Sequence, residues 1–193
     1  MEQARKTRRW DFDMMQQYLR HRFLFEELVK RDFKKKYKRT VLGMAWSLLS
    51  PLLMLLVMKL VFTQFFGRTM EHYTIYLFCG NLVFSYFNES TSQGMTSLVN
   101  NAAIFTKVNI PKYLFLFSKN VQTLINFSLT LCIFFVFCGL DHILFTWKFL
   151  LLLYPVCLLV LFNIGVGLIL SALYVFFRDI QYLWGIFTQI LLY

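Results

Sequence analysis

The side chains that could do chemistry in this sequence lie in three short stretches, and none of these has the spacing of a catalytic centre. They are the basic run at residues 30–39, the polar run Asn88-Glu89-Ser90-Thr91-Ser92-Gln93, and the pair Arg178-Asp179. The phosphate-binding pattern GxxxxGK[ST], the zinc pattern HExxH and the nucleophile pattern GxSxG do not occur. We therefore expect a protein that is not itself an enzyme and that holds no metal centre.

The four cysteines point to packing rather than to chemistry. Cys79, Cys132, Cys138 and Cys157 all lie in apolar runs without CxxC spacing, so we expect them to act as small hydrophobic residues. The composition agrees, because 58% of the residues are hydrophobic and only 16% are charged. Several apolar runs reach or approach the roughly 20 residues that a helix needs to cross a bilayer. These features predict an all-α, polytopic transmembrane helical bundle.

The elements that must position the polar residues are membrane-spanning helices, expected near residues 41–66, 73–99, 121–138 and 149–177. The polar run lies in the second of these, and such groups should face other helices or a wet cavity. Glu89 is a functional candidate there, and the alternative is a helix-packing hydrogen bond. Lys59, in the first span, either extends outward or lines a path. The fifth run, residues 180–193, is too short to cross, so we expect a longer natural chain that is truncated here in its fifth span.

Residues 1–40 form a basic arm, and residues 41–193 form the expected transmembrane domain, incomplete at its C-terminus. Phe25, Leu28, Val29, Phe33 and Tyr37 recur at spacings of three and four between lysines and arginines, which predicts an amphipathic helix in the membrane plane. A nucleic-acid patch would have a similar charge, but here a long apolar run follows at once. The positive-inside rule then places the N-terminus in the cytoplasm of a multi-pass protein of the cytoplasmic membrane.

Four segments resemble one family. The run Arg31–Leu52, which reads RDFKKKYKRTVLGMAWSLLSPL, resembles the opening of polysaccharide-exporting ABC permeases, the membrane subunits that export O-antigen, capsule and teichoic acid. Three later segments fit in the same order: Gly80 with Phe84, Tyr86 and Phe87; the run Asn101–Pro111; and Phe177-Arg178-Asp179-Ile180. The family continues beyond residue 193 through further helices.

The resemblance implies a subunit of an ATP-driven exporter of lipid-linked polysaccharide. Two permease chains would form a homodimer, and separate ATPase subunits would bind ATP and Mg²⁺, so this chain would bind no cofactor and no nucleic acid. The residues expected to couple the chain to the ATPase are Phe33, Tyr37, Asn101, Ile104, Phe105, Lys107, Pro111, Arg178 and Asp179. The residues expected along the translocation path are Tyr73, Tyr76, Phe84, Tyr86, Phe87 and Glu89, because aromatic faces stack on sugars and these share a span with the polar run.

Alternatives stay open at this point. Pro111 also fits an ordinary loop, and Asp179 could cap the next helix while Arg178 stays at the headgroups. An ABC exporter of drugs or lipids would share the fold. A membrane-embedded enzyme would need clustered His, Asp and Glu, whereas Glu89, Asp141 and Asp179 are spread over both expected membrane faces. A scaffold without a transport role is a further alternative.

Overall fold

The computed structural model describes residues 22–36, 42–65, 72–106, 111–143 and 146–192; for residues 44, 62–65, 105 and 148 it describes the backbone alone. Within these ranges every regular element is a helix, as the sequence predicted. An N-terminal helix (residues 22–36) is followed by η1 (Gly43–Ala45), α2 (Trp46–Phe65), α3 (Tyr73–Asn100), α4 (Ala102–Phe105), α5 (Tyr113–Leu140), η2 (Trp147–Leu152), α6 (Leu153–Phe176) and α7 (Ile180–Leu192).

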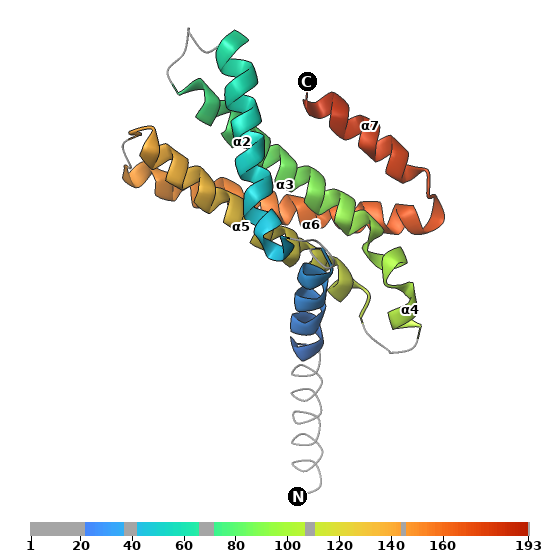
Figure 1. The fold of residues 1–193 in the computed structure, drawn as a ribbon. Helices are drawn as coiled ribbons and strands as arrows, with labels where there is room; N and C mark the ends of the chain where they lie inside the picture. The colour runs from blue at the N-terminus through green and yellow to red at the C-terminus, as the bar shows by residue number, and fades with distance from the viewer. Residues whose placement is uncertain (1–21, 37–41, 66–71, 107–110, 144–145, 193) are drawn as a thin grey trace, which may run out of the picture.

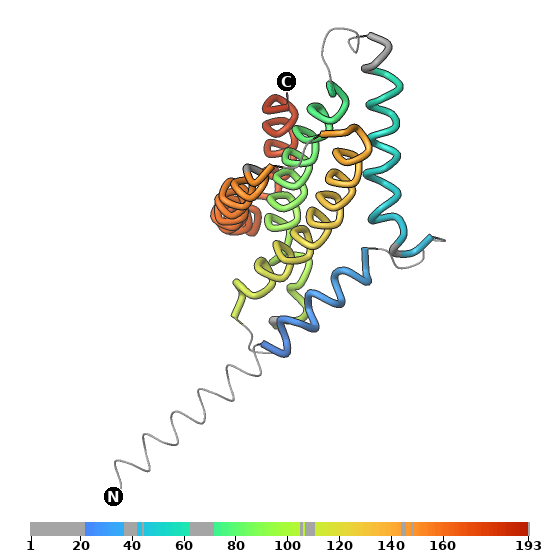
Figure 2. Tube along the Cα trace, turned by 90° about the vertical axis from the view of Figure 1, so that its left-hand side faces the viewer, coloured from blue at the N-terminus to red at the C-terminus, as the bar shows by residue number. Residues whose placement is uncertain are grey.

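Helix α3 is the centre of the bundle (Figure 1). It packs against α2, α5, α6 and α7, and its contacts with α5 and α6 are the most extensive. In the view of Figure 2, α3 and α5 form a middle layer, with α2 on one side and with α6 and α7 on the other. The N-terminal helix lies at one end of this arrangement. Residues carried by α3 are therefore placed between all the other long helices.

A seam of small residues sets the distance between α3 and α6. A β-carbon added at Gly94 would lie 3.3 Å from the Cα atom of Gly167, so the two backbones almost touch. Asn163, Gly167 and Ser171 follow one another at spacings of four on the buried face of α6. Small residues at this spacing allow close helix contact in membranes, where dispersion replaces the hydrophobic effect as the source of packing energy.

The polarity of the interior is the reverse of that in a soluble domain. The side chains that are almost completely buried include these polar ones: Ser90, Thr91, Ser97, Ser118, Gln122, Thr123 and Asn163. The exposed surface is instead rich in leucine, valine, isoleucine and phenylalanine, above all on α2, α6 and α7. Since buried polar groups are normally the exception in water-soluble proteins, this distribution indicates that lipid is the solvent.

Two helical stretches of the described chain are long and apolar enough to cross a membrane, Tyr113–Leu140 and Phe149–Phe176. The apolar part of α2, Trp46–Val61, and helix α7 are shorter. Helix α3 has the length, with 28 residues, but its second half carries the polar run. The expected number of four crossings therefore stays a prediction.

Helix α5 is longer than the membrane span expected near residues 121–138, since it runs from Tyr113 to Leu140. The segment before Val121 carries Lys112 and Lys119, and these charges limit the apolar run on which the expected span was based. In the structure the Lys119 ammonium lies 3.1 Å from Oδ2 of Asp32, so its charge has a partner and the helix continues through it.

Candidate functional site

An ionic cluster, here called the basic junction, ties the N-terminal helix to α3 and α5; its members are Arg31, Asp32, Asn101 and Lys119. Arg31 donates to Oδ1 of Asp32 from Nε (2.9 Å) and from Nη2 (2.6 Å), and Nη2 also donates to Oδ1 of Asn101 (2.8 Å). Lys119 approaches the other carboxylate oxygen. Asp32 is only 3% exposed. A carboxylate so deeply buried is tolerated because two cations share it.

A second ion pair lies at the end of the N-terminal helix. The Lys36 ammonium pairs with Oε1 of Glu89 on α3, and the amide of Gln93, one turn further along α3, donates to the same oxygen (2.8 Å). Lys36 and Glu89 are each about one third exposed. Glu89, which the sequence singled out, is thus held between a cation and an amide, and it sits where the N-terminal helix meets the bundle.

Apolar contacts bring the predicted coupling segment to the same place. Leu28 of the N-terminal helix and Phe115 of α5 form a buried core, against which Leu24, Ile104 and Leu114 pack. Ile104 belongs to the short helix α4, directly after Asn101 of the basic junction. Helix α4 and the N-terminal helix are therefore packed on one another. The sequence predicted a shared role for these two segments, and the role itself stays a prediction.

The other predicted coupling residues that the structure describes belong neither to the basic junction nor to this apolar core. Phe33 is half-buried, and the carbonyl of Pro111 accepts the N–H of Leu114 (3.1 Å) near the start of α5. Arg178 and Asp179 are exposed in the turn between α6 and α7, where the carbonyl of Asp179 accepts backbone N–H groups of α7. In the described part of the chain, the Asp179 carboxylate caps no helix. Tyr37, Lys107 and the side chain of Phe105 lie outside the described residues.

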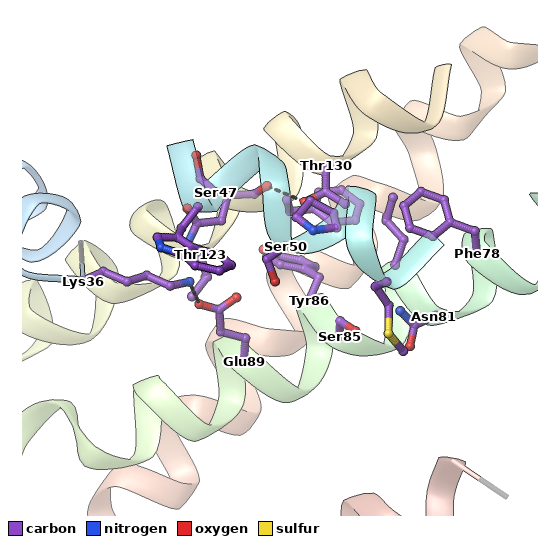
Figure 3. A pocket seen from close by; sticks show the side chains of 16 residues that line it. Lys36, Ser47, Ser50, Phe78, Asn81, Ser85, Tyr86, Glu89, Thr123 and Thr130 are labelled. Carbon is purple, nitrogen blue, oxygen red and sulfur yellow. Dashed lines mark hydrogen bonds and ion pairs between the residues drawn. The ribbon is translucent and has the colours of Figure 1, made fainter. Parts of the chain in front are cut away.

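A cleft of about 470 Å³ opens between α2, α3 and α5 (Figure 3). Lys36 and Glu89 lie at one end of it, and the hydroxyl, amide and aromatic side chains of the three helices form its walls. Its polar lining consists of Ser47, Ser50, Asn81, Ser85, Thr123, Asn126 and Thr130, and its aromatic lining of Trp46, Phe78, Tyr86 and Phe127. Such a mixture can accept hydrogen bonds from hydroxyl groups and stack rings on the apolar faces of a ligand.

Two of the six predicted path residues line this cleft. Tyr86 and Glu89 do so, and the Tyr86 ring lies 4.5 Å, centroid to centroid, from that of Phe127. Phe87 instead packs on the opposite side of α3, against Phe162 (6.1 Å) and Trp184 (6.0 Å). The remaining residues, Tyr73, Tyr76 and Phe84, also lie away from the cleft, and Tyr76 is exposed.

The polar walls of the cleft were not predicted from the sequence, although a signal was present. Asn81, Ser85 and Glu89 are four residues apart on α3, a spacing that puts them on one helix face. Asp32 was also missed, because it lies among lysines and arginines and reads as part of a solvated basic face. Its burial depends on Lys119, which is distant in sequence, so no local pattern could have revealed it.

In the described part of the chain, no three His, Cys, Asp or Glu side chains come together as metal ligands would. All four cysteines are described, and none forms a disulfide.

Comparison with known proteins agrees with this architecture. Residues 24–193 match the family model described as ABC-2 type transporter. The chain is 30% identical over 173 residues to the O-antigen export system permease protein RfbA of Myxococcus xanthus, an alignment that covers 88% of this chain and 65% of that protein. It is 29% identical over 165 residues to the protein of the same name from Klebsiella pneumoniae, covering 82% of this chain and 63% of the relative.

The chain thus spans about two thirds or slightly less of the length of these relatives. The family match, however, covers nearly all of the described helices, from the N-terminal helix to α7. Together with the polar interior and the apolar surface, it makes this a membrane protein that belongs to the ABC-2 type transporter family.

Proposed function

We propose that this chain is the permease subunit of an ATP-driven exporter that moves a lipid-linked polysaccharide across the cytoplasmic membrane. The observation that carries the proposal is the similarity to two O-antigen export permeases over 82–88% of this chain. An alignment of that extent necessarily includes α2, α3 and α5, the helices that form the cleft.

The cleft supports a sugar-containing substrate. Its lining alternates hydroxyl and amide groups with aromatic rings, and each sugar unit offers hydroxyl groups at its rim and apolar C–H faces above and below. A lining of leucine and valine alone would suit a lipid or a hydrophobic drug better. In the proposed transporter, a homodimer of permease chains would extend this surface into a continuous path.

The partner would be a separate ATPase subunit, which binds ATP and Mg²⁺ on the cytoplasmic side. We place its docking surface at α4, because Ala103 and Thr106 are exposed there while Ile104 of the same helix packs inward on Leu28 and Phe115. A displacement of α4 would reach the N-terminal helix through that apolar contact and through the hydrogen bond from Arg31 to Asn101. The N-terminus would then lie in the cytoplasm.

The export function is tested by deleting the gene in its native host and restoring it as the full-length protein. We expect surface polysaccharide to disappear on deletion, lipid-linked glycan to accumulate inside, and both to recover on complementation. Unchanged surface polysaccharide with altered sensitivity to drugs would instead identify an exporter of small molecules, and the proposal would fail.

The partner surface is tested with Ala103→Trp, which adds a bulky ring to the exposed face of α4. Ala172→Trp is the matched control, because Ala172 is exposed on α6, far along the chain from α4. We expect Ala103→Trp to reduce copurification of the ATPase at least tenfold, and Ala172→Trp to leave it unchanged, at equal amounts of permease in the membrane. Equal ATPase yields from the two variants would exclude α4 as the docking surface.

A further inference from the structure

A second, smaller cavity of about 230 Å³ lies at the basic junction, between the N-terminal helix, α3 and α5. Four cationic side chains line it, those of Arg31, Lys35, Lys36 and Lys119, whereas among the described residues of its lining only Asp32 carries a carboxylate. Side-chain amides, among them that of Asn101, complete the wall. This cavity has an excess of positive charge and many N–H donors, and the proposed export function leaves it without a ligand.

Two of the four cations are held in place by one carboxylate, which can neutralise only one of their charges. The buried Asp32 carboxylate engages two of them at once, Arg31 through Oδ1 and Lys119 through Oδ2. The Arg31 side chain is still 38% exposed. Lys35 is exposed on the rim, and in the described residues it forms no hydrogen bond or ion pair. Side chains fixed in this way lose little conformational entropy when an anion binds.

We propose that this cavity binds the phosphate group of a membrane-lipid headgroup. Phosphate is recognised by guanidinium forks, by ammonium groups and by amide N–H donors, and the cavity offers all three. Its volume is below the range of about 300–1,000 Å³ that is usual for sites of whole small molecules, so it suits one polar group of a larger ligand. A lipid is the appropriate source because the N-terminal helix has one apolar and one basic face, a character that places it at headgroup level.

The neighbouring cleft fixes how such a ligand would lie. Lys36 lines both cavities, while Gln93 and Glu89, one turn apart on α3, line the smaller cavity and the cleft respectively. Among the described residues that line the cleft, the one cationic side chain, that of Lys36, is paired with Glu89, so the excess of cations at the basic junction holds the phosphate there. The uncharged remainder of the molecule can then extend along the cleft. The inference does not depend on which substrate is exported, since a bulk phospholipid and a lipid carrier share the same phosphate chemistry.

The test compares charge reversal at two adjacent lysines in the full-length protein. Lys35→Glu changes the rim of the cavity. Lys34→Glu is the matched control, because Lys34 is also exposed on the same helix but does not line the cavity. Both residues are at the surface, so both variants are expected to fold. Affinity is measured in an uncharged detergent for short-chain phosphatidylglycerol, for a short polyprenyl phosphate, for the matching diacylglycerol without phosphate, and for inorganic phosphate.

Each unit of charge near the headgroup changes the affinity about fivefold, and Lys35→Glu changes the charge by two units. We therefore expect Lys35→Glu to weaken binding of both phosphate-bearing lipids by roughly thirtyfold, and Lys34→Glu to weaken it by less than about threefold. Preference for one of the two phospholipids would identify the natural source. Equal losses in the two variants would reduce the effect to general surface charge and overturn the inference. Diacylglycerol binding as tight as that of the phospholipids would also overturn it, and inorganic phosphate binding as tightly as the lipids would show a site for a soluble anion instead.

Discussion

The contact between Gly94 and Gly167 makes a sharp prediction about how α3 is held. Replacing Gly94 by leucine would place a β-carbon 3.3 Å from the Cα atom of Gly167, with three further carbon atoms beyond it. Carbon atoms in favourable contact are about 3.5–4.0 Å apart, so the β-carbon alone is already too close. The clash is with backbone, which cannot rotate away, and α3 and α6 must therefore separate.

The expected cost lies at the upper end of the range for overpacking, about 3 kcal/mol. For a chain of this length, that loss lowers the melting temperature by roughly 6–12 °C. Gly165→Leu is the matched control, because Gly165 lies on α6, two residues before Gly167, and a β-carbon there meets no atom within 4 Å. It is expected to change stability by about 0.5 kcal/mol or less, as surface substitutions do.

The assay is thermal unfolding of the full-length protein in detergent, followed by the loss of helical signal and of monodisperse protein. Gly94→Ala should give a smaller loss than Gly94→Leu, since it adds the β-carbon alone. Equal melting temperatures for Gly94→Leu and Gly165→Leu would refute the argument that close backbone contact at this seam determines the packing of α3 on α6.

Two further predictions concern polar contacts of α3. Ser90 donates to Oδ1 of Asn120 (2.6 Å) at a fully buried position, so Ser90→Ala should lower the free energy of unfolding by about 0.6–1.7 kcal/mol in the same assay. Ser128→Ala is the control, because the Ser128 hydroxyl is exposed and bonds only within its own helix, and this variant should cost less than half as much. Glu89→Gln removes the ion pair with Lys36, which is worth up to about 1 kcal/mol at its partial exposure. Amide hydrogen exchange in residues 22–36 should therefore accelerate up to about fivefold. The double variant Lys36→Glu with Glu89→Lys, which swaps the two charges, should restore slow hydrogen exchange. Exchange in the double variant as fast as in the single one would contradict this role of the pair.

The long apolar runs determined most of the helices. Helix α7 begins at Ile180, directly after Arg178-Asp179, as the break in hydropathy predicted. Helix α5 begins before the expected span, at Tyr113, and continues through the charged residue Lys119. Only its ion pair with Asp32, across a large separation in sequence, shows why a lysine is accepted inside the bundle.

The candidate sites were only partly predictable for the same reason. Helical periodicity puts Asn81, Ser85 and Glu89 on one face of α3, and this could have been read directly from the sequence. The sequence does not show which helices face that side of α3. Phe87 illustrates the difference: its place in the polar span suggested the translocation path, but the packing of α6 and α7 turns it toward Phe162 and Trp184.

The sequence by itself was enough to predict a membrane protein, the helical class and the family. These properties depend on the length of apolar runs and on short motifs, which can be read without knowledge of contacts. The tertiary structure alone decided which polar groups meet. Gly94 brings α3 against Gly167 of α6, while the N-terminal helix brings Asp32 to Lys119 and Lys36 to Glu89. These pairings depend on the relative placement of whole helices, and that placement follows from close packing between residues that no local pattern connects.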